Sequence, residues 1–373
     1  MAINYASTFL KDVDERFTKE SQSKLGCSAS VDFTGNRTVK VYSIPTVPMN
    51  DYDRTAGSNR YGTPVILEDQ VQEMTVKKDR SFTFTLDRMD REETEMTHDA
   101  GKALKRQTSE VVKPEVDTYT FAVQTKTAKA NGGYICAAPS KSNAYELFLK
   151  AGEHLGNELV PDSGRVAFCS YAFANYLMQD PAFMRDTETA QDMIIKGVVG
   201  TIDGVKIVKV PASRLPKNTA CLVVHPCATA QPMRLQEFKV HDNPPGINGW
   251  LVEGRIVYDA FVFDSKAKAL FVIDTSSALG NVTVTSEAGT ESGKTKLTLS
   301  GDYASAPVGG KIMYKAEAAA ATVTFGTAVT GFTEWDGKSE ITVASAKNVI
   351  TVALVDADNK PVASGTVTAV IKS

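Results

Sequence analysis

The feature that most constrains the fold is a change in sequence pattern near Ser276. After this point, short runs of alternating apolar and polar residues recur, and Gly, Asp or Asn separates them. Alternation with a period of two is typical of strands that bury one face. The spacing therefore predicts a C-terminal antiparallel β-sandwich over residues 276–373, which a linker at Asp274–Gly280 joins to the rest of the chain. The predicted strands are Val282–Thr285, Lys294–Leu299, Lys311–Lys315, Ala321–Phe325, Glu340–Ala344, Val349–Leu354 and Thr366–Ile371.

Two details of this C-terminal region carry separate expectations. The segment 356–365 contains Asp, Asn, Pro and Gly, which favour a hairpin turn. Its acidic residues also suggest calcium, but the later Gly and bidentate Glu of an EF-hand loop are missing. Trp335 is expected to anchor the core of the small sandwich, with an exposed contact as the alternative.

An extended arm is predicted near the N-terminus, after a short helix at Thr8–Glu20. Extended runs at 36–48 and from Pro64 through Phe82–Leu86 flank a polar, turn-rich segment at 49–63. The tip of this arm carries two aromatic and two basic residues of the types enriched in interface hot spots. We therefore predict an assembly contact at the tip; the alternative is a mobile surface loop with incidental aromatic residues. The four candidate residues are Tyr52, Arg54, Arg60 and Tyr61.

Residues 92–275 mix helical and extended patterns. Helices are expected at Glu92–Val112 and Glu115–Lys129, with Pro114 interrupting or restarting the helix and Asn131–Gly133 ending it. A third helix is expected at Ser142–Glu158, and a fourth after Ser170, which has the side chain of a good N-cap. The remaining expected elements are strands at Arg165–Cys169, Ala220–Val224, Gln236–Val240, Trp250–Tyr258 and Ala260–Phe263, and a strand, turn and strand over 197–211.

Charge and cysteine content exclude some classes of protein. The chain has 41 Lys and Arg against 44 Asp and Glu, which gives a net charge of −3. This balance excludes a protein that binds nucleic acid by strong positive charge alone. No apolar run has the length of a transmembrane helix, and the N-terminus lacks a Sec signal pattern. We therefore interpret the five cysteines as reduced thiols of a cytosolic product.

No convincing catalytic, cofactor or metal site emerges from the sequence. Cys221, His225 and Cys227 form the best metal-like group, but they lack paired CxxC spacing and a fourth ligand. A buried strand that ends in a His-Pro turn explains them better, and a Cys–His nucleophile pair is the weaker alternative. The glycines of 197–204 do not open a helix, so Asp203 and Gly204 indicate a hairpin turn. The stretch Asp87–Glu95 is interpreted as a solvated helix start, with an acidic site or interface pairing as alternatives.

The order of these elements resembles the major capsid proteins of tailed bacteriophages, which have the Hong Kong 97-type fold. The similarity is strongest over residues 197–273, and the C-terminal region resembles bacterial Ig-like domains. The segments that carry it are GTIDGVKIVKVP, RLPKNTACLVVHPCATAQPMRL and EFKVHDNPPGINGWLVEGRIVYDAFVFDSKAKALFVI.

The resemblance implies an α+β fold class and a division of the chain into five parts. The body would have an N-arm, an E-loop, a P domain with a long spine helix, and an A domain. An all-β Ig-like sandwich would follow and face out from the shell. The implied ranges are 1–35 for the N-arm, 36–90 for the E-loop and flanking strands, 91–196 for the P domain, 197–275 for the A domain, and 276–373 for the Ig-like domain.

The resemblance also implies a structural protein of the virion and not an enzyme. It would be made in the host bacterial cytoplasm and would self-assemble through hexamers and pentamers into an icosahedral shell around double-stranded DNA, without a cofactor or a membrane. Its partners would be other copies of itself, a separate scaffold protein, portal and decoration proteins, and weakly contacted DNA. The alternatives are a phage tail or tube protein or an adhesin that binds host surfaces through the Ig-like domain, and, less favoured, an enzyme.

Overall fold

The structure is a computed structural model, and parts of the chain lie outside the residues that it describes. Among the predicted features, the helix at Thr8–Glu20, most of the N-arm, and the first residues of the Glu92–Val112 helix fall outside it. The described residues are 21–28, 38–43, 46–55, 58–64, 66, 70–89, 100–180, 200–346 and 348–372.

A six-stranded mixed sheet forms the centre of the body, in the order β4-β13-β8-β5-β7-β6. Helices α4 and α5 pack on one face, and helix α3 packs on the other. Because both faces are covered, the central strands are mostly apolar, and β8 is buried at every position. The bounds are β4 Tyr134–Cys136, β5 Val166–Ser170, β6 Thr201–Ile202, β7 Val205–Val210, β8 Thr219–Val224, β13 Leu270–Asp274, α3 Lys113–Ala130, α4 Ala144–Asn157 and α5 Tyr171–Gln179.

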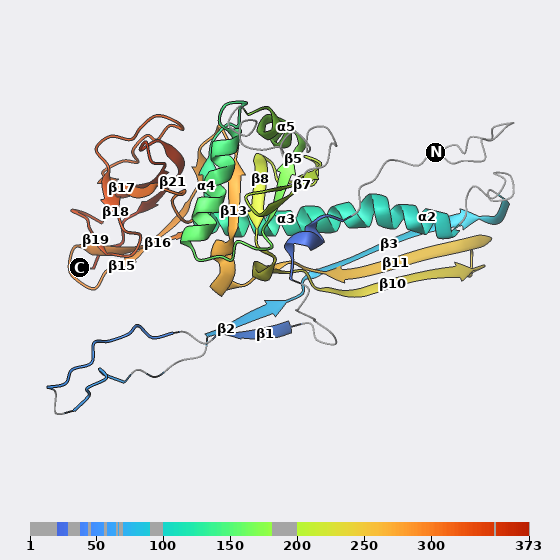
Figure 1. The fold of residues 1–373 in the computed structure, drawn as a ribbon, viewed down its shortest axis with the longest axis horizontal. Helices are drawn as coiled ribbons and strands as arrows, with labels where there is room; N and C mark the ends of the chain where they lie inside the picture. Colours follow the sequence, from blue (N-terminus) through green and yellow to red (C-terminus); the bar gives the residue numbers. More distant parts are fainter. Residues whose placement is uncertain are drawn as a thin grey trace.

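One long helix crosses the molecule beneath this sheet (Figure 1). It consists of α2 (Ala100–Gln107), a π-helical turn (Thr108–Val112) and α3. Of the two expectations for Pro114, the restart is confirmed: α3 begins at Lys113 with Pro114 in its first turn, and helical residues continue through this position without a break. Proline lacks an N–H and clashes with the carbonyl four residues earlier, and a wider π turn before it relieves both problems. The predicted end is confirmed: Asn131 caps the helix, and Gly132 has a φ of +76°.

A three-stranded antiparallel sheet runs along the α2 half of the long helix, in the order β10-β11-β3 (Figure 1). Its strands are β3 (Lys78–Asp87), β10 (Met233–Asp242) and β11 (Gly249–Tyr258). Ile256 and Tyr258 of β11 pack against Val116 of the helix. Strands β10 and β11, both from the range 197–275, therefore belong to this second sheet beside the helix and not to the six-stranded sheet.

The predicted two-stranded arm is shorter than the sequence suggested. Strand β1 (Thr38–Ser43) pairs with β2 (Gln70–Thr75), whereas β3 pairs with β11 and lies outside the arm. The extended run from Pro64 to Leu86 is therefore two strands with different partners. The two strands are joined by Val76 and Lys77, and Val76 is almost fully buried in the body.

The C-terminal region forms two sheets that enclose an apolar core, with Trp335 buried as predicted. Two expectations fail: Ala321–Phe325 is not a strand, and the hairpin turn is shorter, because β21 begins at Pro361. The alternation at 321–325 suits a strand, but β18 occupies the sheet edge beside β17. The five-stranded sheet has the order β14 (Gly280–Asn281), β21 (Pro361–Thr368), β20 (Val349–Val355), β17 (Lys311–Glu317), β18 (Thr333–Trp335); the other has the order β15 (Thr283–Ala288), β16 (Lys294–Ser300), β19 (Ile341–Thr342).

Short elements complete the fold and confirm three local predictions. Ser170 caps α5 by accepting a hydrogen bond of 3.2 Å from the Phe173 N–H. Asp203 and Gly204 both have positive φ, as the predicted hairpin turn requires. The His-Pro segment forms a 3₁₀ turn, as expected. The remaining elements are β9 (Thr229–Ala230), β12 (Phe261–Val262) and 3₁₀ turns at Ser23–Gly26, Pro226–Ala228 and Asp264–Ala269.

Candidate assembly surface

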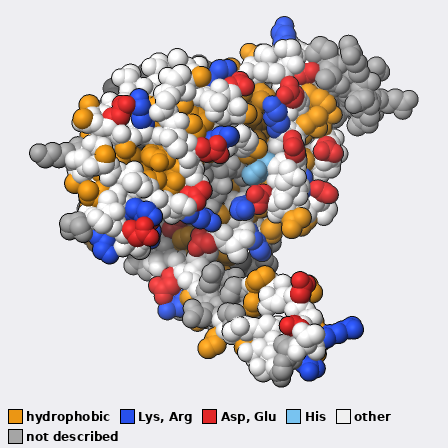
Figure 2. Space-filling view, turned by 90° about the vertical axis from the view of Figure 1, so that its left-hand side faces the viewer, with side chains coloured by type: hydrophobic (Ala, Val, Ile, Leu, Met, Phe, Trp, Pro, Cys, Tyr) orange, Lys and Arg blue, Asp and Glu red, His pale blue; other side chains and the backbone are white. Residues whose placement is uncertain are grey.

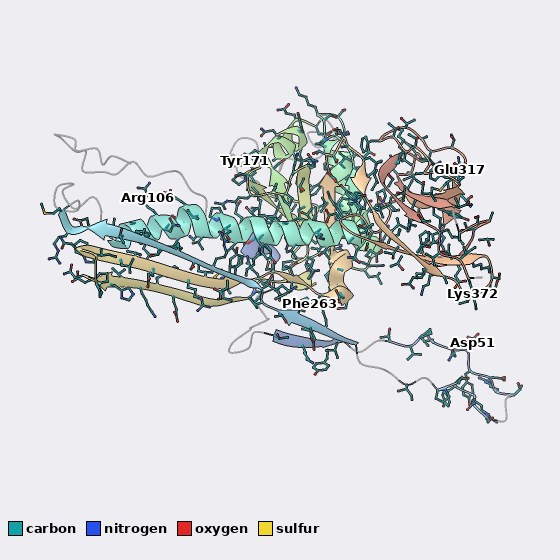
Figure 3. The ribbon with its side chains drawn as sticks, turned by 180° about the vertical axis from the view of Figure 1, so that it is seen from behind. Asp51, Arg106, Tyr171, Phe263, Glu317 and Lys372 are labelled. Atoms are coloured by element: carbon teal, nitrogen blue, oxygen red, sulfur yellow. The ribbon has the colours of Figure 1, made fainter. Side chains whose placement is uncertain are left out.

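The β1–β2 arm extends from the body below the six-stranded sheet, and its tip projects away from that sheet (Figures 1 and 3). Strands β1 and β2 pair in register from Thr38 opposite Thr75 to Ser43 opposite Gln70. A two-stranded ribbon has no second sheet to cover its faces and is marginal in isolation. The arm therefore needs contacts beyond its own two strands.

The four candidate tip residues are exposed, and the chain brings them together in one turn. The rings of Tyr52 and Tyr61 meet edge to face, with centroids 5.0 Å apart. Between them, the Asp53 N–H donates to the Arg60 carbonyl at 3.1 Å, so the two sides of the tip are joined. Arg54 follows directly and is exposed. The tip thus presents aromatic and cationic side chains on a hydrogen-bonded turn.

Large apolar side chains remain exposed along the arm and its tip. Met49 is 99% exposed, Ile66 86% and Tyr61 85%, and Tyr42, Val47, Tyr52 and Val71 are also exposed. The space-filling view shows apolar side chains interspersed with charged ones on the lobe below the body (Figure 2). Concentrated apolar exposure on a thin projection is typical of a surface that another molecule covers.

The root of the arm is fixed firmly to the body. Met74 and Val76 are each 1% exposed and pack with Ala230 and Phe263. The Gln72 side chain donates to the Val262 carbonyl at 2.9 Å and accepts from the Asp264 N–H at 3.1 Å. The direction of the arm is therefore set by the body and not by the two strands alone.

Asp259 holds the junction between β2 and β3 in place. Its Oδ2 accepts the Lys77 N–H at 2.8 Å, and its Oδ1 accepts the Tyr119 hydroxyl at 2.8 Å. Burial first, and then this hydrogen bond, raise the pKa of Tyr119 to about 12. The carboxylate thus links the junction of β2 and β3 to the middle of α3.

Asp117 of α3 is a second buried anchor, and it holds the segment that enters the body near the N-terminus. Its Oδ1 accepts the Ser21 and Ser23 hydroxyls at 2.7 and 2.6 Å, and its Oδ2 accepts the Gln22 N–H at 3.1 Å. Arg214 forms an ion pair of 2.9 Å with the same carboxylate. Both charged groups are almost fully buried, so each charge is compensated by the other and not by solvent.

A third anchor joins the C-terminal sandwich to the end of α3. The Lys129 ammonium and the Tyr303 hydroxyl both donate to Asp274 Oδ2, at 2.6 and 2.7 Å. Tyr134 donates to the Ser305 carbonyl at 3.0 Å, and the Ser305 hydroxyl donates to the Ala130 carbonyl at 2.9 Å. The sandwich is therefore attached to the body through a buried network and not only through the chain.

The residues of the proposed metal-like group do not converge. Cys221 is buried against Cys169 in the sheet. One nitrogen of the His225 ring accepts the Cys227 N–H at 3.3 Å, and the other lies 3.1 Å from the Ser163 carbonyl. Within the described residues, no group of three His, Cys, Asp or Glu side chains could hold a metal ion.

The other weak candidates are local structure or lie outside the description. Asp356 caps the turn to β21 by accepting the N–H groups of Asp358 and Lys360 at 3.0 and 2.8 Å, as a hairpin turn requires. Most of the acidic stretch Asp87–Glu95 is not described. In the described part of the chain, no helix is long and apolar enough to cross a membrane.

The fold and the exposed arm can be compared with known proteins. No family model and no curated protein sequence matches the chain. Solved structures do match: "Mycobacterium phage Che8" at 17% identity and a TM-score of 0.57, covering 73% of this chain and 98% of that one. "Capsid structure of the Cyanophage P-SCSP1u" matches at 14% identity and a TM-score of 0.58, covering 73% and 93%. "Asymmetric unit of bacteriophage PhiM1 mature capsid" matches at 13% and 0.56, covering 73% and 92%.

These likenesses show the fold. The match spans nearly the whole length of these chains from phage capsids. The resemblance to tailed-phage major capsid proteins is therefore confirmed at the level of fold. The part of this chain outside the match is just over a quarter of its length.

Proposed function

We propose that the chain is a structural subunit of a phage capsid, which self-assembles into a closed shell and performs no catalysis. The observation that carries this proposal is the fold match over more than nine-tenths of the capsid chains. The exposed, apolar arm supports it, because a shell subunit needs a projection that a neighbouring copy covers. Many modest contacts of this kind add up to a stable particle.

The finer parts of the proposal concern assembly and partners. We infer that the arm tip, with Tyr52, Arg54, Arg60 and Tyr61, contacts a neighbouring copy within hexamers and pentamers. The shell would enclose double-stranded DNA, which a net charge of −3 would hold only weakly. A separate scaffold protein, portal and decoration proteins would complete the virion, and the subunit would be made in the host bacterial cytoplasm.

The domain assignments belong to the same proposal. In the ranges given above, 36–90 would be the E-loop and flanking strands, and the long helix would be the spine of the P domain. The sandwich of residues 276–373 would be an Ig-like domain displayed outside the shell. Two features support this: its first and last strands, β14 and β21, pair in parallel, and β17, β20 and β21 are neighbours in one sheet.

Electron microscopy of the purified full-length protein, with its size distribution in solution, tests the proposal. We expect closed shells or rings of five and six subunits. The double variant Tyr52→Ala/Tyr61→Ala should lose assembly while it keeps a folded monomer, and Tyr171→Ala on helix α5, far from the arm tip, serves as the control (Figure 3). Stacked rings or tubes would instead indicate a tail protein. Assembly of the double variant with wild-type yield would contradict the role of the tip.

A further inference from the structure

Two cysteines meet at the middle of the six-stranded sheet. Cys169 of β5 and Cys221 of β8 are direct partners in the antiparallel register, and their Sγ atoms are 3.2 Å apart. Strands β5 and β8 are the central pair of the sheet. The two thiols therefore lie where the half containing β4, β13 and β8 meets the half containing β5, β7 and β6.

The register of the two cysteines is compatible with a disulfide. Directly opposed residues of antiparallel strands have Cα atoms about 4.5 to 5.5 Å apart. This range lies within the span of about 4.4 to 6.8 Å found for disulfides. Closing the sulfur separation from 3.2 Å to a bond of about 2.05 Å needs only small side-chain rotations.

The surroundings determine which oxidant could act. Both thiols are completely buried, together with Phe173 and Leu177 of α5 and Phe271 of β13. Burial raises the pKa of Cys221, and the neighbouring thiol adds to this shift, so the reactive thiolate is rare. A bulky disulfide reagent cannot reach the pair in the folded protein. A small, uncharged peroxide is the class of oxidant that can reach such a site, and its reaction there would be slow because the thiolate is rare.

We propose that Cys169 and Cys221 form an oxidation site, at which a peroxide-class oxidant converts the two thiols into a cross-strand disulfide. In the first step, one thiol and the peroxide give a sulfenic acid and, with hydrogen peroxide, one water. The second thiol then attacks the sulfenic sulfur, the S–S bond forms, and a second water leaves. Two thiols are oxidised, and one peroxide is reduced to two waters.

The consequence is a covalent link across the centre of the body. The two cysteines are 52 positions apart in sequence, so the link closes a long loop and limits the unfolded chain. A subunit that leaves a reducing cytoplasm for an oxidising medium would be stabilised after it has folded. This inference does not depend on the capsid proposal, because it concerns the fold of one chain.

The test is a thiol count on the folded full-length protein. The protein is treated with hydrogen peroxide, quenched with catalase, denatured and alkylated, and its peptides are mapped. We expect a linked Cys169–Cys221 peptide with a mass about 2 Da lower than the two reduced peptides together, and no peptide that links either cysteine to Cys27, Cys136 or Cys227. The midpoint of thermal unfolding should rise by roughly 5 °C and return after reduction with dithiothreitol.

Two variants keep the outcome decisive. Cys227→Ser should retain the linked peptide and the thermal shift, because this cysteine lies outside the pair. Cys169→Ala should abolish both. Alkylation of both Cys169 and Cys221 after peroxide treatment of the wild-type protein would overturn the proposal, and so would sulfinic or sulfonic acids at these two positions without a linked peptide. The wild-type result stands even if Cys169→Ala fails to fold.

Discussion

The Tyr119 hydroxyl donates a hydrogen bond of 2.8 Å to Asp259 Oδ1, and this contact joins the middle of α3 to the turn between β11 and β12. The same carboxylate accepts the Lys77 N–H at the junction of β2 and β3, where the arm leaves the body. The position of the arm thus depends on a contact between two residues that are 140 positions apart.

Removing the Tyr119 hydroxyl should destabilise the junction of β2 and β3. Tyr119→Phe is expected to lower the free energy of unfolding by about 1 kcal/mol, because a hydrogen bond to a charged acceptor is lost at a half-buried site. Urea unfolding followed by circular dichroism measures the change. Tyr42→Phe, on the exposed face of β1, is the matched control and should have no effect. Equal stability of the two variants would show that the Tyr119–Asp259 contact does not stabilise the junction of β2 and β3.

Asp117 should be far less tolerant of substitution. Asp117→Asn keeps the shape of the side chain but leaves the Arg214 guanidinium buried without its counter-charge, at an expected cost of about 3 to 5 kcal/mol. Chemical denaturation measures this cost. Glu146→Gln removes an exposed carboxylate that pairs with the exposed Lys150 and should cost less than about 1 kcal/mol. If the two variants cost the same, Asp117 is not the anchor that its contacts indicate.

Gly254 makes room for an aromatic ring. A Cβ at this position would lie 2.3 Å from the Phe82 ring, which crosses it from the paired strand β3. Gly254→Ala should therefore destabilise the three-stranded sheet by about 1 to 3 kcal/mol. Gly156→Ala in α4 meets nothing within 4 Å and should be neutral or stabilising. Thermal unfolding of both variants checks the difference in sign, and a stable Gly254→Ala protein would contradict the close packing.

Local signals predicted local structure well. Ser170 is followed by a helix because its hydroxyl can accept an N–H of the first turn, and this contact needs no distant partner. Asp203 and Gly204 form a hairpin turn for the same reason, since both tolerate positive φ. The buried strand at Ala220–Val224 followed from an unbroken apolar run.

Long-range pairing could not be read from the sequence in the same way. The run from Pro64 to Leu86 looks uniformly extended, yet β2 and β3 pair with strands from different parts of the chain. Of the two anchors, only Asp259 stands out in the sequence as a lone acidic residue among apolar neighbours, because Asp117 lies close to Glu115. That signal indicates burial with a partner but does not say which partner, since Tyr119 is distant in sequence.

Asp336 should make the stability of the C-terminal sandwich depend on acid pH. Its carboxylate accepts the Ser339 hydroxyl and the N–H groups of Ser339 and Lys338, and these hydrogen bonds lower its pKa from 3.8 to about 2. Because the folded pKa is depressed, the stabilisation is present above pH 3.8 and is lost as the pH falls through about 2.

The variant Asp336→Asn tests this dependence. Fluorescence of Trp335 in a Trp250→Phe background reports the turn directly, since the indole donates to the Ser339 carbonyl at 2.7 Å. Asp336→Asn should be less stable than its parent at pH 5, and the difference should shrink toward pH 2. Glu334→Gln, on the neighbouring exposed position, is the control. A difference that stays constant over this range would contradict the assignment.

The attachment of the C-terminal sandwich rests on Lys129, and this gives the last prediction. Lys129 and Asp274 form an ion pair with side chains 11% and 0% exposed, so Lys129→Met leaves a buried carboxylate with only its hydrogen-bond donors. We expect a loss of about 3 kcal/mol or more and a separate early unfolding transition in calorimetry. One turn earlier, Lys126 pairs with Asp302 across the same junction, but both side chains are at least 66% exposed. Lys126→Met should therefore cost less than about 1 kcal/mol and keep a single transition. A single, unshifted transition in Lys129→Met would show that the sandwich is held by apolar packing alone.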